Sequence, residues 1–298
     1  MNFITKHAKI AVIIAVICGA CSGSFSALTA IPAIGIGFWR LTLVLPFFLI
    51  PVLTSPEKKK LLKEVSRTDL LWCGLSGLFL FIHYFSWFNA VKMTNVASAA
   101  VLASFHPLAV LAVTVFILKQ KVSLKSVAAI MASLIGGAVV MGFDMEALAG
   151  GHLIGNLLGL SAGIFMGLYF AVGGHVRKRV DGSIYVLLVF AACWICFIAA
   201  SIGTGTALLG YTLTDYLYVA AMAIVCQMGA HAVFNICMGH VNSLYVSAWE
   251  TADPVFCILI AVITLGQVPT VYEIVGCAIV VGALLLYNYF ESKESSKR

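Results

Sequence analysis

Two carboxylates lie near the middle of an apolar stretch long enough to cross a bilayer. The stretch is 242–265, NSLYVSAWETADPVFCILIAVITL, and the acids are Glu250 and Asp253. A charge at that depth costs about 2.5–3.5 kcal/mol on insertion scales, so a compensating interaction is expected. Residues three or four apart share a helix face, which also brings in Trp249. Pro254 removes a backbone donor and should break the helix here, so we expect this face to line a substrate cavity.

Two carboxylates on one poorly solvated face repel each other, so a bound proton or a nearby cation is expected. That suits either proton coupling or recognition of an amine. The alternative is structural: backbone donors freed at the helix break, with polar neighbours such as Thr251, could satisfy both acids.

Histidines are the natural partners of these acids, because imidazole titrates near neutrality. His106 directly precedes Pro107, and His83 lies in the preceding apolar segment. His106 facing Asp253 could relay a proton or rearrange as the cavity changes access. Either histidine could instead be a hydrogen-bonded packing residue.

An aromatic face accompanies His83, because Tyr84 and Trp87 are three apart and His83 and Trp87 are four apart. Such a face could meet Trp249 and attract an ammonium group through the ring quadrupoles. Ordinary aromatic packing and an interfacial aromatic belt are the competing interpretations.

Two further polar positions are candidates. Gln227, His231 and Asn235 form a stripe at four-residue spacing, which interhelical hydrogen bonds alone would explain, and His231 is kept as a secondary site residue. Arg40 lies about two turns into the second apolar segment and needs a carboxylate or a snorkelling path. A solute carboxylate at Arg40 with its amine at Glu250 or Asp253 would make an amino acid a complementary cargo.

The composition places these residues in a polytopic membrane protein. The 298 residues are 62% hydrophobic and 10% charged, too little polar surface for a soluble domain of this length. We find no metal-ligand spacing, serine elbow, phosphate loop or nucleic-acid module, so no cofactor, metal or nucleic acid is expected. The nine cysteines fall inside apolar segments and are expected to be free thiols.

Hydropathy predicts ten membrane-spanning helices. With ten spans, sixteen of the 18 Lys and Arg residues fall on one side, Lys92 falls on the other, and Arg40 lies inside a span. A miscounted helix would invert every later loop, so the count is self-consistent and both termini are expected in the cytoplasm. The segments are 10–31, 33–53, 69–90, 95–118, 124–142, 153–172, 184–204, 215–238, 244–265 and 271–290.

An internal repeat relates the two halves with an offset of 147 residues. Five spans per half is an odd number, so the halves, 1–147 and 148–298, are expected to be inserted in opposite orientations, with the binding site at their interface. The positions before the two equivalent prolines are His106 and Asp253. The matched pairs are Asn95 and Asn242, Pro107 and Pro254, Val115 and Val262, Leu118 and Leu265, and Gln120 and Gln267.

Glycines recur at four-residue spacing along the sixth segment and form a stripe: Gly155, Gly159, Gly163 and Gly167. Such stripes let helices approach closely. Packing alone explains the stripe, and a pivot during alternating access is the second interpretation.

Three short motifs stand in a recognisable order along the chain: Phe38-Trp39-Arg40-Leu41, the run 90–97 followed by His106-Pro107, and the glycines Gly136, Gly137, Gly276 and Gly282. In these motifs and their order the chain resembles the EamA-like transporters of the drug/metabolite transporter superfamily, and the likeness covers nearly its whole length. The resemblance implies ten helices in two five-helix repeats and transport of a small metabolite, often outward. This chain has Gln120 and Gln267 where such proteins often have glutamate.

These observations together predict an all-α transporter of the inner, cytoplasmic membrane, with small solute, lipid and protons as partners. It would move an amino-acid-like or amine-bearing metabolite outward by alternating access. An importer or exchanger of the same fold remains open, as do a membrane-embedded enzyme, a non-transporting membrane partner, and a monomeric or homodimeric state.

Overall fold

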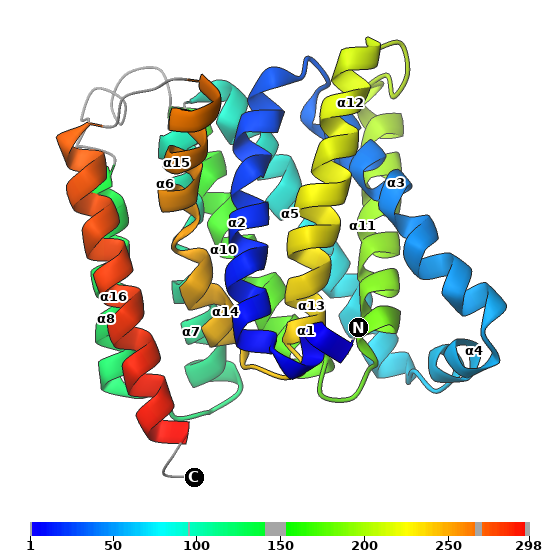
Figure 1. Ribbon diagram of the computed structural model, residues 1–298. Coiled ribbons are helices and arrows are strands. Elements are labelled where there is room, and N and C mark those ends of the chain that lie inside the picture. Colours follow the sequence, from blue (N-terminus) through cyan, green and yellow to red (C-terminus); the bar gives the residue numbers. More distant parts are fainter. Residues whose placement is uncertain (1, 95, 141–152, 266–269, 296–298) are drawn as a thin grey trace.

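The computed structural model describes residues 2–94, 96–140, 153–265 and 270–295. Within these ranges ten crossing segments can be followed, which confirms the predicted all-α membrane fold (Figure 1). Seven helices are long and apolar enough to cross a bilayer, and two shorter ones match the predicted fifth and tenth spans. The ninth span is interrupted beside its acids, so it is two helices rather than one.

The first half holds five crossing segments and two short helices, α1 (Asn2–Lys6) and α4 (Pro56–Lys63). In lipid every backbone polar group must be satisfied within the element, which is why the apolar runs form helices. The predicted fifth span ends, as far as the structure describes it, at Val140. The crossing segments are α2 (Ala8–Leu28), α3 (Ala33–Thr54), α5 (Arg67–Met93), the broken fourth segment α6 (Val96–Ala103), α7 (His106–Ala112) and η1 (Val113–Ile117), and α8 (Leu124–Val140).

The second half repeats this order. Its third segment is continuous but contains a stretch of π-helix, η2, and its fourth is broken as in the first half. The segments are α10 (Leu153–Val176), α11 (Gly182–Thr204), α12 (Leu213–Ala221) with η2 (Met222–Ala232) and α13 (Val233–Cys237), α14 (Ser243–Glu250) with α15 (Asp253–Leu265), and α16 (Val271–Ser295).

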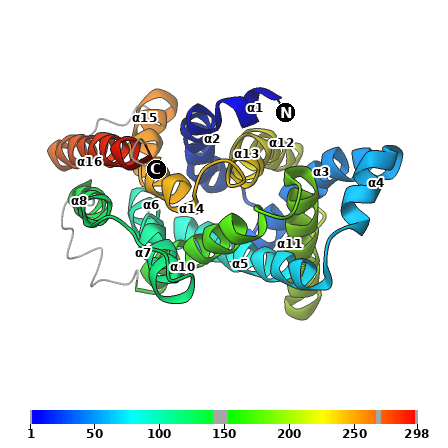
Figure 2. The ribbon, with the colours of Figure 1, turned by 90° about the horizontal axis from the view of Figure 1, so that it is seen from below.

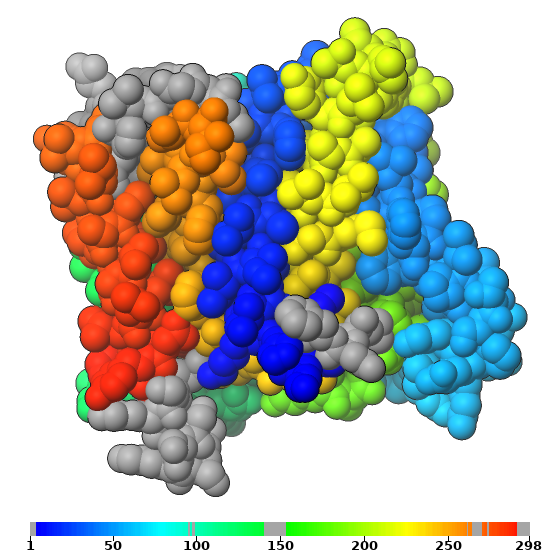
Figure 3. Space-filling model, viewed as in Figure 1, coloured from blue at the N-terminus to red at the C-terminus, as the bar shows by residue number. Residues whose placement is uncertain are grey.

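Contacts between the halves come in symmetric pairs, as inverted repeats require. α2 packs on η2, and its counterpart pairing is α5 with α10. The broken segments cross, α6 against α15 and α7 against α14, and the last helices α8 and α16 pair with each other. Figure 3 shows α2 lying in contact between α15 and α12. The interface between repeats is therefore the core of the molecule.

One end of the bundle carries α1, α4, the segment after η1, the loop after α10 and the C-terminal end of α16 (Figure 1). We call it the basic end, because the Lys and Arg residues of these segments gather there. The loop 177–181 adds Arg177, Lys178 and Arg179. By the positive-inside rule this end is predicted to face the cytoplasm.

The glycine stripe of α10 seats the broken fourth segment. A Cβ on Gly163 would lie 2.6 Å from the Ala103 carbonyl oxygen, and a Cβ on Gly167 would meet the His106 carbonyl. No side chain fits there, so the stripe lets α10 touch the backbone on both sides of the break before His106. Close packing at the stripe therefore fixes the position of His106, a candidate site residue.

Gly163→Ala is expected to destabilise the protein, because the backbone carbonyl groups that the added methyl would meet cannot move without displacing the helix break. Overpacking of this kind costs about 1–3 kcal/mol. Gly203→Ala is the matched control, since nothing lies within 4 Å of the added methyl. Thermal unfolding of the purified variants in detergent measures the difference, and equal midpoints for the two variants would contradict the assigned role.

Candidate functional site

In both broken segments a two-residue turn separates the upstream helix from an ionisable residue that begins the downstream helix. Ser104 and Phe105 form a turn before His106, the first residue of α7, and Thr251 and Ala252 form a turn before Asp253, the first residue of α15. The following prolines cannot donate a hydrogen bond to the preceding turn, which ends each upstream helix there. The predicted break in the ninth segment is confirmed, and the fourth segment has its symmetric equivalent.

A cavity of about 40 Å³ lies between the halves at the level of these two breaks. It contains seven of the nine residues that the sequence singled out, and it excludes Arg40 and Trp249. We call it the central cavity. It is lined by Gly19, Ser22, His83, Tyr84, Trp87, Ala100, Ala103, Ser104, His106, Met166, His231, Glu250 and Asp253.

The two carboxylates of the central cavity have no cationic partner. In the described part of the chain no Lys or Arg forms an ion pair with Glu250 or Asp253, and Glu250 Oε2 is buried without a hydrogen bond. Asp253 Oδ2 accepts from the Cys257 thiol at 3.4 Å, a weak donor. The Thr251 hydroxyl donates to the Ala248 carbonyl and lies 2.6 Å from Ser133 Oγ instead. The acids are therefore available to a ligand on the cavity side.

His106 joins the two halves. Its Nδ1 lies 2.7 Å from Ser247 Oγ of α14, and its ring meets Phe170 of α10 edge-on, with centroids 6.0 Å apart. His106 thus lines the cavity with the acids while its bonded nitrogen holds α14. Ser247 was not singled out by the sequence, although it lies one turn before Glu250 on the same helix.

The polar stripe of the eighth segment divides into structural and cavity residues. Tyr84 donates to Gln227 Oε1 at 2.7 Å, and Tyr169 donates to Asn235 Oδ1 at 2.6 Å, so both amides serve interhelical hydrogen bonds. His231, between them, lines the cavity with its ring 5.0 Å from that of Tyr84. His231 Nδ1 is buried without a partner in the described residues.

On the opposite wall, His83 is held in place by the backbone of α10. Its Nδ1 lies 2.8 Å from the Ala162 carbonyl oxygen, and its ring centroid is 6.1 Å from that of His231. Trp87, one turn further along α5, also lines the cavity. The predicted aromatic face of this helix is thus directed at the site, and Trp249 is not among the described residues that line it.

Arg40 lies just behind the cavity wall and is 1% exposed. Its Nη1 donates to Ser22 at 3.3 Å and its guanidinium carbon is 4.7 Å from the centroid of the Tyr84 ring. Both of these contacts are cavity residues. The Nε and Nη2 atoms have no hydrogen-bond partner in the described residues, and neither snorkelling nor an ion pair accounts for the charge.

Trp249 is not among the residues that line the central cavity, although helical spacing predicts it on the face of the acids. Its indole donates to Asn288 of α16 at 3.2 Å. The turn at Thr251 and Ala252 interrupts the register, so a residue four before Asp253 no longer shares its face. The same break still leaves Glu250 and Asp253 in one cavity because each flanks the turn directly.

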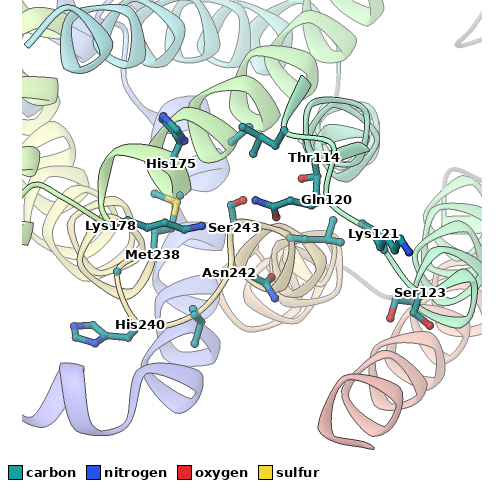
Figure 4. Close-up of a pocket in the computed structure, with 18 of the residues that line it drawn as sticks. Thr114, Gln120, Lys121, Ser123, His175, Lys178, Met238, His240, Asn242 and Ser243 are labelled. Carbon is teal, nitrogen blue, oxygen red and sulfur yellow. The ribbon is translucent and has the colours of Figure 1, made fainter. Parts of the chain in front are cut away.

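A second and larger hollow opens at the basic end. Its volume is about 420 Å³, and its lining residues come from the segment 114–126 of the first half and from 171–178, 238–244 and Tyr287 of the second (Figure 4). Figure 2, seen from this end, shows α7, α10 and α14 side by side. We call it the basic vestibule. Sequence reasoning did not find it, because its residues lie in loops and helix ends with no shared spacing.

Comparison with known proteins identifies the fold. A family model described as the EamA-like transporter family matches residues 7–142 and 153–289. An uncharacterized transporter of Clostridium kluyveri is 24% identical over 257 residues, covering 83% of this chain and 81% of the relative. A solved crystal structure aligns with a TM-score of 0.77 and 18% identity, over 96% of this chain and 98% of the other.

The two matched regions stop on either side of residues 143–152, so the predicted boundary between 147 and 148 falls in the interval between them and outside the described residues. Each region holds five of the crossing segments. The chain belongs to the EamA-like transporter family and is a membrane transporter, not an enzyme.

Proposed function

We propose that this transporter moves an amino-acid-like or amine-bearing metabolite across the cytoplasmic membrane by alternating access around the central cavity. The observation that carries the proposal is the pair Glu250 and Asp253, which share a cavity between the repeats without a cation in the described residues. Buried carboxylates need a positive partner, and an ammonium group or protons would supply it.

The proposed binding mode uses both the acidic pair and the guanidinium group near the cavity. The ammonium group lies between Glu250 and Asp253, and a carboxylate on the same solute approaches the guanidinium of Arg40 across Ser22 and Tyr84. The cavity of about 40 Å³ has room for a few waters at most, since about 10–15 Å³ is enough for one, so the halves must separate to admit a solute. Rocking of the two repeats about this level provides that separation.

Outward movement is proposed as the working direction, with both termini in the cytoplasm and the basic end inside. The clustering of Lys and Arg at that end supports the orientation. Reconstitution into proteoliposomes with labelled amino acids, and with amines that lack a carboxylate, tests the proposal. Absence of uptake, efflux and counterflow for both groups of solutes would refute it.

A pH gradient is expected to drive net movement of the cargo if Glu250 and Asp253 exchange protons as access alternates. Accumulation should collapse with a protonophore, whereas exchange of labelled for unlabelled solute at equal pH should persist. Asp253→Asn should then lose the response to the gradient before it loses exchange. Accumulation that is unchanged by a protonophore would leave solute exchange as the mode of transport.

A further inference from the structure

The basic vestibule carries the opposite charge pattern to the central cavity. Lys121, Lys178, His175 and His240 line it, and none of the described lining residues is acidic. The central cavity has two acids and no Lys or Arg among its described lining residues. The two hollows therefore differ in the chemical group that each can receive.

Of the three basic residues 177–179, Lys178 is the one whose side chain has neither a hydrogen bond nor an ion pair among the described residues. Arg177 is buried and donates to the backbone carbonyls of Asn235, Val180 and Ile236. Arg179 forms an ion pair with Asp69, with Nη2 and Oδ1 2.6 Å apart. No described carboxylate pairs with Lys178, which lines the vestibule instead. Two of the three charges thus have structural partners and the third has space for a ligand.

Three polar side chains converge in this space. Figure 4 shows Lys178 and Gln120 directed toward Ser243 from opposite sides, and all three line the same hollow. Ser243 begins α14, so the positive end of that helix also faces the site. A Cβ on Gly174 would lie 2.8 Å from Ser243 Cβ, so a glycine is what lets α10 bring Lys178 close to this helix.

A thin layer separates the vestibule from the central cavity. On α14, Leu244 lines the vestibule, Ser247 bonds to His106, and Glu250 lines the cavity. At 1.5 Å per residue, Ser243 and Glu250 are about 10 Å apart along the helix axis. On α10 the same order is Gly174, Phe170 and Met166. The vestibule therefore lies on the direct path from the basic end to the acids.

The residue at position 120 keeps this path free of negative charge. A carboxylate at this position would line the same hollow as Lys178 and neutralise its charge. Gln120 instead offers an amide that can donate to an anion. The lysine, the amide, the hydroxyl and the helix end supply four kinds of donor to one space.

We propose that the basic vestibule is an oxyanion site, in which Lys178, Gln120 and Ser243 hold the carboxylate or phosphate group of a small solute at the basic end. That this solute is the cargo rests on the proposed function; the anion site itself does not. A carboxylate held here would leave the other end of an amino-acid-like solute facing the layer of His106, Phe170 and Ser247.

Pyridoxal phosphate tests the site on the purified full-length protein in uncharged detergent. Its phosphate seeks an anion site, and its aldehyde condenses with a nearby lysine amine, releasing water; borohydride then reduces the imine to a stable amine. Mass spectrometry should show Lys178 labelled faster than Lys119, an exposed lysine that does not line the vestibule. Succinate or inorganic phosphate should slow the labelling of Lys178 and leave that of Lys119 unchanged.

Gln120→Glu should reduce the labelling of Lys178 about ten-fold, because it places a like charge beside the bound anion. Gln120→Asn is the neutral control and should retain most of the labelling, with unfolding midpoints confirming that both variants fold. Protection by succinate identifies a carboxylate site, and protection by phosphate alone identifies a phosphate site. Labelling of Lys178 that responds to neither anion, or that equals Lys119 in rate, would overturn the proposal.

The same samples separate this inference from the proposed function. Glu250→Gln should leave the labelling of Lys178 unchanged while it abolishes transport in proteoliposomes. Anion-sensitive labelling without any transport would support the anion site in the vestibule and refute the proposal that its ligand is a transported solute. Transport of an amino acid whose half-saturation concentration at the basic end is unchanged by both Lys178→Gln and Gln120→Glu would remove the vestibule from the cargo pathway.

Discussion

Glu250→Gln and Asp253→Asn are each expected to abolish transport of an amine-bearing solute. Removing one partner of a buried charge pair costs about 3–5 kcal/mol. Binding of the ammonium group should therefore weaken by roughly 10²–10⁴-fold. Initial rates of uptake and of counterflow in proteoliposomes measure the loss.

These variants should lose transport but gain stability. Glu250 Oε2 is buried without a hydrogen-bond partner in the described residues, so a neutral amide relieves a desolvated charge. The unfolding midpoint of Glu250→Gln should rise while transport disappears. Glu57→Gln, at an exposed position on α4, is the matched control and should change neither property. Full transport by both cavity variants would exclude the acids from the site.

Arg40→Met is expected to stabilise the protein and to remove its preference for solutes with a carboxylate. The guanidinium is 1% exposed with two nitrogens unpartnered in the described residues. Replacing a buried, poorly paired charge with a packed apolar side chain typically stabilises by about 1–4 kcal/mol. Methionine keeps the contact with the rings of Tyr84 and Phe88. Chemical or thermal unfolding measures the gain.

Arg177→Met provides the control for burial of an arginine. Arg177 is also buried, but it donates to three backbone carbonyls, which the substitution would leave unsatisfied. It should lower the unfolding midpoint, whereas Arg40→Met raises it. In transport, Arg40→Met should lose amino acids but keep amines that lack a carboxylate. A loss of stability equal to that of Arg177→Met would mean that Arg40 is structural.

The fold followed from the sequence because its causes are local. A bilayer requires about 20 apolar residues per helix, and the distribution of Lys and Arg tests the count of helices at every loop. The prolines at 107 and 254 mark the broken helices by removing backbone donors, whatever packs around them. These features can be recognised in the sequence without knowing how the helices pack, so composition and spacing were enough to predict the fold.

Part of the candidate site was also accessible from single residues. An ionisable group inside an apolar span is easy to recognise in a sequence. Seven of the nine residues that were predicted on this ground, or as neighbours of such a group, line the central cavity. Trp249 was placed incorrectly relative to the acids because helical periodicity was continued through a turn. Ser22, Ser104 and Ser247 were missed because serine is common in membrane helices and carries no comparable signal.

The sequence by itself determined the ten helices, their inverted halves and the ionisable residues at mid-depth, since each depends on the chain's own hydropathy, charge and proline positions. Only the tertiary structure decided which polar groups stay without partners. The amide oxygens of Gln227 and Asn235 accept from tyrosines, whereas Arg40 and Glu250 keep side-chain atoms without a partner in the described residues. The amide nitrogens of Gln227 and Asn235 are also without a partner there, and all of these outcomes depend on which helices pack together. The basic vestibule arises in the same way, because residues far apart in the chain enclose it only when the two halves meet.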